Sequence, residues 1–322
     1  MNRKTKGWLV AAALLVIVGA AVCVGVMQPL KWDFGKLNTK HYETQVYDIT
    51  KKFDNISIYT DTSDIAFELA EDGNCRVVCR EDEKMPHSVL VKDGTLEIAL
   101  TDNREWWEHI GIGSEETSIS ICLPRAEYAS LYIEETTGDI TVPKEFRFKN
   151  LEIRATTGDV ECYASAEESF IIAADTGDIK AENISAGSIE LSVTTGDITL
   201  GNAECEGSLK IGVTTGKTDI RGVKCESLAA EGDTGDIRLT DVIASGAFSI
   251  ERTTGDVIFD RCDAAEIFVR TDTGDVNGSL LSEKYFVIET NTGDVDVPRT
   301  MGGGKCEIIT DTGDIEITEE RK

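Results

Sequence analysis

Apolar and polar residues alternate along most of this chain, and the alternation itself repeats with a nearly constant period. A glycine preceded by threonine returns every 19 or 20 residues, ten times between Gly138 and Gly313. Apolar residues stand seven and five positions before each glycine, and a second alternating run follows it. A spacing of two is the period of a strand with one buried face. Each unit therefore predicts a strand, a tight corner at Thr-Gly-Asp, a second strand and a polar return loop.

A two-stranded unit of this size cannot bury its own apolar face, whereas stacked copies can. Strands of successive copies would pair about 4.8 Å apart, and like side chains would form columns inside the stack. One such column would hold Leu151, Phe170 and Ile189. We therefore expect an all-β fold, a single-stack β-solenoid of about ten coils over residues 131–322. The alternative is an antiparallel meander with Thr-Gly hairpin turns, but a meander gives no reason for so strict a period.

One copy of the repeat departs from the pattern. Lys217 and Thr218 stand between Gly216 and the next aspartate, Asp219, whereas the other nine copies have Asp directly after glycine. If the pair is an insertion, Asp219 takes the usual Asp position and Cys225 falls in an apolar column of the return loops. We therefore expect a two-residue bulge at this corner, absorbed by a shorter return loop.

The region before the array alternates less regularly. It contains a copy of the corner with Ser63 in place of glycine, and further short runs that predict strands. We expect irregular first coils and a cap over residues 48–130, preceded by a linker at residues 28–47. Trp106 and Trp107 lie together in a polar loop, where we interpret them as a plug for the open end of the stack. Exposed aromatic contacts with a protein or sugar partner are the alternative.

The N-terminus carries a targeting signal. Residues 8–27 hold no charge, and twenty residues at about 1.5 Å each just cross a hydrocarbon layer of roughly 30 Å. Three basic residues within residues 1–7 predict a cytoplasmic tail, a single-pass signal anchor in the cell membrane and an extracytoplasmic remainder. A cleaved signal peptide is an alternative, since residues 19–21 are small. A lipoprotein cysteine at Cys23 is disfavoured because bulky Val22 precedes it.

Charge narrows the range of partners. The chain has 59 acidic and 32 basic residues, and its formal net charge of −27 disfavours nucleic acid. Polycations, metal ions, cationic wall components or simple solubility remain as explanations. The nine cysteines form no CxxC pair, and we interpret most of them as small core residues. On one strand, Cys75 and Cys79 would point the same way about 13 Å apart, too far for a disulfide.

Candidate chemistry is sparse. The three histidines, His41, His87 and His109, all precede the array, and no nucleophile elbow, Walker A loop or HExxH helix is present. Cys75, Cys79 and His87 would make a poor zinc site, because the cysteine spacing is unusual and a fourth ligand is missing. We therefore predict no enzymatic activity and assign no catalytic, cofactor-binding or metal-binding residues.

The aspartates of the corners should stack into a ladder. Carboxylates about 4.8 Å apart repel by roughly 1 kcal/mol per pair in bulk water, and calcium could relieve that repulsion. The spacing matches neither the nonapeptide calcium repeat nor an EF-hand, so we interpret the ladder as turn capping by hydrogen bonds to threonine and backbone N–H groups. The expected ladder is Asp139, Asp159, Asp178, Asp197, Asp219, Asp236, Asp256, Asp275, Asp294 and Asp314, with second acids at Asp175, Asp233, Asp272 and Asp311.

The run ISICLP, which ends at Leu123 and Pro124, and the strands closed by TTGDI or DTGDV resemble a bacterial β-strand-repeat family of unknown function labelled "putative adhesin". The resemblance covers residues 48–322. It implies an envelope-associated β-solenoid and brings no catalytic residues.

We therefore expect a membrane-anchored, extracytoplasmic surface or scaffold module that contacts an envelope protein or glycan, with avidity if the partner spans several coils. An envelope stress-sensing or regulatory membrane protein is one alternative. A polysaccharide-active solenoid enzyme is another, and it would need a groove holding acids and a basic residue that break the repeat, of which the sequence shows no sign.

Overall fold

The computed structural model begins with helix α1 (Arg3–Met27) and describes residues 3–29, 31–32, 41–104 and 116–320. Within these stretches, no helix has both the length and the hydropathy needed to cross a membrane. The side chains of residues 9–11, inside the expected anchor, are not among those described. The expected plug of Trp106 and Trp107 also lies outside the described residues.

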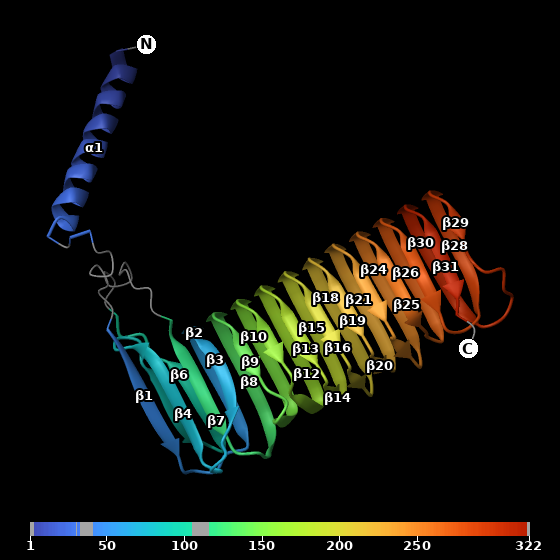
Figure 1. Ribbon diagram of the computed structural model, residues 1–322, viewed down its shortest axis with the longest axis horizontal. Helices are drawn as coiled ribbons and strands as arrows, with labels where there is room; N and C mark the ends of the chain where they lie inside the picture. The colour runs from blue at the N-terminus through green and yellow to red at the C-terminus, as the bar shows by residue number, and fades with distance from the viewer. Residues whose placement is uncertain (1–2, 30, 33–40, 105–115, 321–322) are drawn as a thin grey trace.

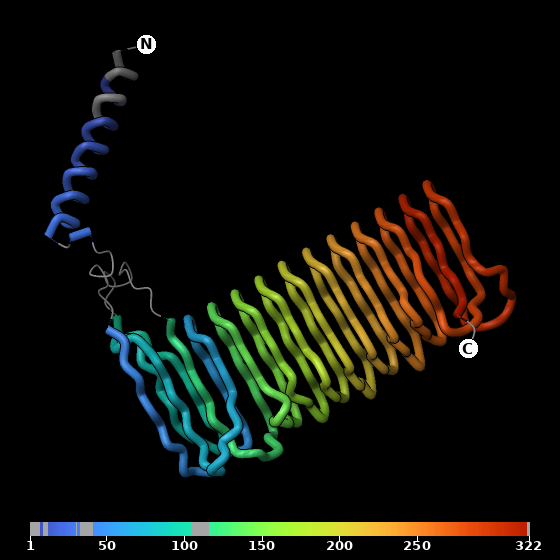
Figure 2. The backbone as a smooth tube through the Cα atoms, viewed as in Figure 1, coloured from blue at the N-terminus to red at the C-terminus, as the bar shows by residue number. Residues whose placement is uncertain are grey.

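The remainder is a single stack of coils, visible as a long ladder of strands in Figures 1 and 2. Among the described residues, two large sheets of 14 and 13 strands, here sheet A and sheet B, enclose one buried hydrophobic cluster. A short sheet C of four strands joins them. In the regular coils the chain runs along sheet B, turns the Thr-Gly corner, and returns along sheet A.

The strands are bounded as follows. Sheet B holds β2 (Asn55–Thr62), β5 (His87–Lys92), β6 (Thr95–Leu100), β8 (Glu127–Thr137), β10 (Arg147–Thr157), β12 (Ser165–Thr176), β15 (Ser188–Thr195), β18 (Ser208–Thr215), β21 (Ser227–Thr234), β24 (Ala247–Thr254), β26 (Glu266–Thr273), β28 (Lys284–Thr292) and β30 (Gly304–Thr312). Sheet A holds β1 (Tyr42–Ile49), β3 (Asp64–Leu69), β4 (Cys75–Asp82), β7 (Ser118–Leu123), β9 (Ile140–Val142), β11 (Val160–Cys162), β13 (Ile179–Glu182), β16 (Ile198–Gly201), β19 (Thr218–Arg221), β22 (Ile237–Thr240), β25 (Val257–Cys262), β27 (Val276–Leu280), β29 (Val295–Asp296) and β31 (Ile315–Glu319). Sheet C holds β14 (Ser185–Ala186), β17 (Glu204–Cys205), β20 (Lys224–Cys225) and β23 (Ile243–Ala244).

The expected columns are present. Leu151 pairs with Phe170 and Phe170 with Ile189 on neighbouring parallel strands, and all three side chains are at most 1% exposed. Parallel pairing in register confirms the β-solenoid and excludes the meander for this array, because hairpin turns would make neighbouring strands antiparallel.

The corners require glycine for a steric reason. The ten corner glycines have φ between 124° and 157°, a region that L side chains rarely adopt. A Cβ atom on Gly158 would lie 1.9 Å from the carbonyl oxygen of Gly138 in the preceding coil. The Gly158 N–H in turn donates to the carbonyl of Thr176 in the next coil, at 3.0 Å. The Thr-Gly pair therefore recurs because each corner rests directly on the one below it.

The bulge expected at Lys217 and Thr218 is wrong. Lys217 occupies the usual Asp position, with its N–H donating to Asp197 Oδ1 at 2.7 Å, and Thr218 pairs with Ile198 of the coil below. The fully buried Val223, rather than Cys225, fills the return-loop column. The corner therefore carries substitutions in register and contains no insertion.

A buried arginine explains Thr218 at this corner, whereas nothing in the structure explains Lys217. Arg252 is 4% exposed, and it donates from Nη1 to the Val213 carbonyl at 2.9 Å and from Nη2 to Thr218 Oγ1 at 3.1 Å. Gly232, in the coil between them, leaves room, since a Cβ atom there would lie 2.0 Å from Nη1. Thr218 of sheet A therefore accepts a hydrogen bond from Arg252 of sheet B across the core, and Gly232 makes room for the guanidinium.

Chain order and stacking order differ at both ends. Strand β30 pairs with β26 on one side and β28 on the other, so the last coil lies inside the one before it. At the other end, β2 lies between β8 and β6. In this column Ile267 pairs with Cys306, and Cys306 pairs with Phe286, so the column departs from chain order here. Every coil offers the same pairing edges, so the repeat pattern does not encode the order of the coils.

Antiparallel strands close the N-terminal end. Strand β1 pairs with β4 from Tyr42 to Ile49, and β5 pairs with β6. Strand β1 therefore begins inside the segment of residues 28–47 that we expected to be a linker. Residues 42–47 form a strand because they cover the otherwise unpaired edge of β4.

Candidate functional site

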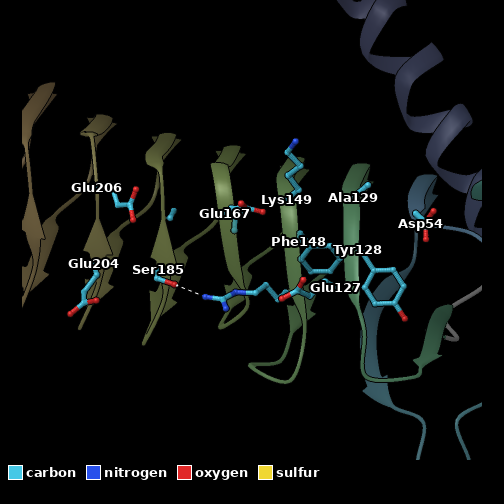
Figure 3. A pocket seen from close by; sticks show the side chains of 13 residues that line it. Asp54, Glu127, Tyr128, Ala129, Phe148, Lys149, Glu167, Ser185, Glu204 and Glu206 are labelled. Atoms are coloured by element: carbon cyan, nitrogen blue, oxygen red, sulfur yellow. Dashed lines mark hydrogen bonds between the residues drawn. The ribbon is translucent and has the colours of Figure 1, made fainter.

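A groove of about 660 Å³ lies beside the first regular coils, where sheet C begins (Figure 3). Strands β8, β10 and β12 have 11 or 12 residues, whereas β15 and β18 have eight. In the later coils a short strand of sheet C, first β14, precedes the shortened strand of sheet B. The groove therefore lies where coils with a long sheet B strand are followed by coils with a shorter one.

The floor of the groove is aromatic but covered. The rings of Tyr128 and Phe148 lie 5.9 Å apart between centroids, and Phe53 stacks on Tyr128 at 6.1 Å. Tyr128 is 4% exposed and Phe148 1% exposed. Their rings therefore support the floor and present little surface to a ligand.

The rim of the groove is charged and exposed. Arg147 donates from Nη2 to Ser185 Oγ at 3.3 Å, and Lys149 forms an exposed ion pair with Glu168 at 3.2 Å. The rim carries five acidic side chains and two basic ones, a formal excess of three negative charges. These are Asp54, Glu127, Glu167, Glu204 and Glu206, with Arg147 and Lys149.

This groove could not be recognised in the sequence. Its acids and bases stand outside the corner repeat and come from several coils, which only stacking brings together. One local signal existed: residues 144–149 hold three basic residues in a strongly acidic chain. The groove thus holds acids and a basic residue that stand outside the repeat. This is the arrangement that a polysaccharide-active enzyme would need, and we saw no sign of it in the sequence.

The corner aspartates form a hydrogen-bonded ladder. Asp139 Oδ1 accepts from the backbone N–H of Asp159 at 2.9 Å, and Asp159 Oδ1 accepts from that of Asp178 at 2.8 Å. The ladder starts one coil earlier than expected, at Asp64, whose Oδ1 accepts from Asp139 N–H at 3.0 Å. Asp219 is not part of it and pairs instead with Thr199 on a strand. These contacts support turn capping, and nothing here tests calcium binding at the ladder, the alternative that we favoured less.

A buried carboxyl group lies in the same column as Arg252, several coils nearer the N-terminus. Glu135 is 2% exposed, and its Oε1 accepts from the backbone N–H of Ser63 at 3.1 Å. Burial, together with the neighbouring carboxylates of Asp64 and Asp139, raises the pKa of Glu135 to about 7 in spite of the hydrogen bond from Ser63, which lowers it. Its charge therefore changes near neutral pH.

The N-terminal cap brings together part of the zinc set that we disfavoured. Cys79 and His87 lie close to each other and to Glu81, and all three are buried. Cys75 is four residues away on β4 and is not in this cluster. Burial, with Glu81 nearby, raises the pKa of Cys79 to about 12. The strand period of two could have indicated Glu81, since it places residues 79 and 81 on one face.

Comparison with known proteins shows both a family and a fold. The model of the family described as Toastrack DUF4097 matches residues 53–222 and 208–322. A comparison with the curated proteins finds no match.

Several solved structures are similar. One, a "putative lipid binding protein" from Parabacteroides distasonis, has 16% identity and a TM-score of 0.51, over 75% of this chain and 98% of that one. A "putative adhesin" from the same species has 12% identity and a TM-score of 0.44, over 87% and 98%. A "putative adhesin" from Bacteroides fragilis has 14% identity and a TM-score of 0.40, over 87% and 98%. At these identities the likeness concerns the fold alone.

Proposed function

The chain belongs to the Toastrack DUF4097 family, and we propose that it is a non-enzymatic interaction module that binds a protein partner through the groove beside β8, β10 and β12. The observation that supports this proposal is the charged groove, which interrupts an otherwise uniform stack. The adhesin names of several proteins with similar folds agree with a role in surface contacts.

The chemistry of the groove favours a protein segment that carries basic side chains. The rim has an excess of acidic groups, which attract lysine and arginine and speed encounter with a cationic surface. Arg147 and Lys149 can in addition bind an acidic group of the partner. The rim therefore favours a partner segment whose basic and acidic residues follow a particular order. A glycan ligand is less favoured, because Tyr128 and Phe148 are too buried to offer an aromatic face.

We further propose that the module is held at the outer face of the cell membrane. The uncharged run of residues 8–27 and the basic residues before it support a single-pass anchor with a cytoplasmic N-terminus. Helix α1 covers this run. Alkaline extraction of membranes should leave the full chain in the pellet, and replacement of Val16 and Val18 by lysine should release it.

Charge reversal tests the groove. The full chain, immobilised in detergent, captures partners from an envelope extract, and binding of each identified protein is then measured with purified components. Glu204→Lys/Glu206→Lys should weaken binding at least tenfold, whereas Glu251→Lys/Glu316→Lys, which changes exposed acids outside the groove, should not. Equal binding by both double variants would show that the partner does not bind at the groove.

The enzyme alternative has one observation in its favour, since acids and Arg147 do meet in the groove. However, every groove carboxylate is exposed, whereas a general acid at neutral pH needs a desolvated carboxyl group. Release of reducing ends from an added polysaccharide, abolished by Glu127→Gln or Glu204→Gln, would overturn the non-enzymatic proposal.

A further inference from the structure

We propose that the N-terminal cap contains a structural site for a divalent transition metal, best suited to Zn²⁺, with Cys79, Glu81 and His87 as its protein ligands. Cys79 and Glu81 alternate on β4 and therefore share a face, and His87 is the first residue of β5. The ligand atoms of the three residues all lie within 4.8 Å of one another. Thiolate, carboxylate and imidazole are the donors that zinc takes in proteins.

The surroundings of His87 prepare one ring nitrogen for a metal. Its Nε2 lies 2.9 Å from Thr60 Oγ1, and its Nδ1 lies 2.6 Å from Glu81 Oε2. When Nε2 carries the proton and donates it to Thr60, Nδ1 turns its lone pair toward Glu81 and Cys79. Metal-binding histidines are commonly held in this way, with the second nitrogen donating to a neighbouring oxygen.

An unpartnered atom gives independent support. Glu81 is 1% exposed, and its Oε1 has no hydrogen-bond partner among the described residues. Its Oε2 accepts from the His87 backbone N–H at 2.7 Å as well as facing the ring. A buried carboxylate oxygen without a partner is costly, and a bound cation supplies the missing interaction.

Charge balance also favours a filled site. One thiolate and one carboxylate carry two negative charges, so a bound divalent cation leaves the buried site formally neutral. Three protein ligands leave a fourth position for a water or for the hydroxyl of Tyr47, which donates to the His87 carbonyl at 3.0 Å. Glu81 thus takes the place of Cys75 in the set of Cys75, Cys79 and His87 that the sequence offered.

The expected role is structural. Cys79 is 0% exposed and His87 4% exposed, so a substrate has no access to the metal. The ligands join β4 to β5, while Thr60 lies on β2 and Tyr47 on β1. A metal here would tie the antiparallel cap to the first coil of the stack, where the repeat is least regular.

The test uses the full chain, stripped with a chelator and dialysed against Zn²⁺ alone. We expect one Zn²⁺ per chain, and Co²⁺ in its place should show a thiolate-to-metal charge-transfer band. Cys79→Ser, Glu81→Gln and His87→Gln should each weaken Zn²⁺ binding at least tenfold. The matched control is Cys75→Ser, which changes a buried cysteine on the same face of the same strand and should bind as the wild type does.

A second variant separates the site from general damage to the fold. Thr60→Val keeps all three ligands and should weaken binding about 10–100-fold, as loss of an outer hydrogen bond does at other metal sites. Zn²⁺ should raise the unfolding temperature of the wild type and of Cys75→Ser, but not of Cys79→Ser. Absence of stoichiometric Zn²⁺ in the wild type, or unchanged binding in all three ligand variants, would overturn the proposal.

Discussion

Replacing Thr218 by valine keeps the shape of the side chain and removes its hydroxyl, the acceptor of a hydrogen bond from Arg252 Nη2 at 3.1 Å. The guanidinium is buried, and its Nε has no partner among the described residues. Burial already lowers the pKa of Arg252, so its charge is poorly compensated before the change. A hydrogen bond to a charged group contributes about 1.5–3 kcal/mol, and we expect Thr218→Val to destabilise these coils by about 2 kcal/mol.

Hydrogen exchange read by mass spectrometry is the suitable assay. Coils in a stack contact only their neighbours, so a local loss of stability need not shift the global transition by the same amount. Amides in residues 208–254 should exchange about 30-fold faster in the variant under conditions of rapid reclosing, the equivalent of 2 kcal/mol. Amides of the coil containing β10 should keep the rates of the wild type.

The Arg252→Met background supplies the control. Methionine fills similar space and donates no hydrogen bond, so Thr218→Val should then be neutral or slightly stabilising. The coupling energy between the two positions should therefore be about 1.5–3 kcal/mol. If Thr218→Val costs the same in both backgrounds, the hydroxyl does not act through Arg252 and the account of this corner is wrong.

Three further changes test other features of the stack. Because the pKa of Glu135 is raised from 4.5 to about 7, its protonated form stabilises the folded state fully below pH 4.5, and this contribution is lost as the pH rises through 7. Urea unfolding should show a decline on the order of 3 kcal/mol over that window, and Glu135→Gln should flatten it. Gly232→Ala should destabilise by about 1–3 kcal/mol because its Cβ meets the buried guanidinium at 2.0 Å, whereas Gly212→Ala, with its nearest atom at 3.7 Å, should be tolerated. Lys217→Asp restores an acceptor for the N–H of Asp236 and should raise the unfolding midpoint, with a gain of about 0.5–1 kcal/mol, while a fall would contradict the ladder.

The sequence alone was enough to predict the individual coil. The period-two alternation of apolar and polar residues predicted the strands, and the fixed position of the glycine predicted the corner. The columns of Leu151, Phe170 and Ile189 followed because every coil meets the same environment above and below it. In such a stack each strand packs against the equivalent strands of the neighbouring coils. The sequence of one coil therefore also shows which residues it contacts.

Tertiary structure decided the features in which the coils differ. Thr218 satisfies Arg252, which is 34 residues away, so no local reading of residues 217–218 could place them in register. The same holds for the groove, which forms where strands of two lengths meet. It also holds for His87, because β5 belongs to sheet B and β4 to sheet A, and only this arrangement turns His87 toward Glu81. The order of the end coils was also undetermined, because equal repeats offer equal pairing edges and only side-chain burial separates one arrangement from another.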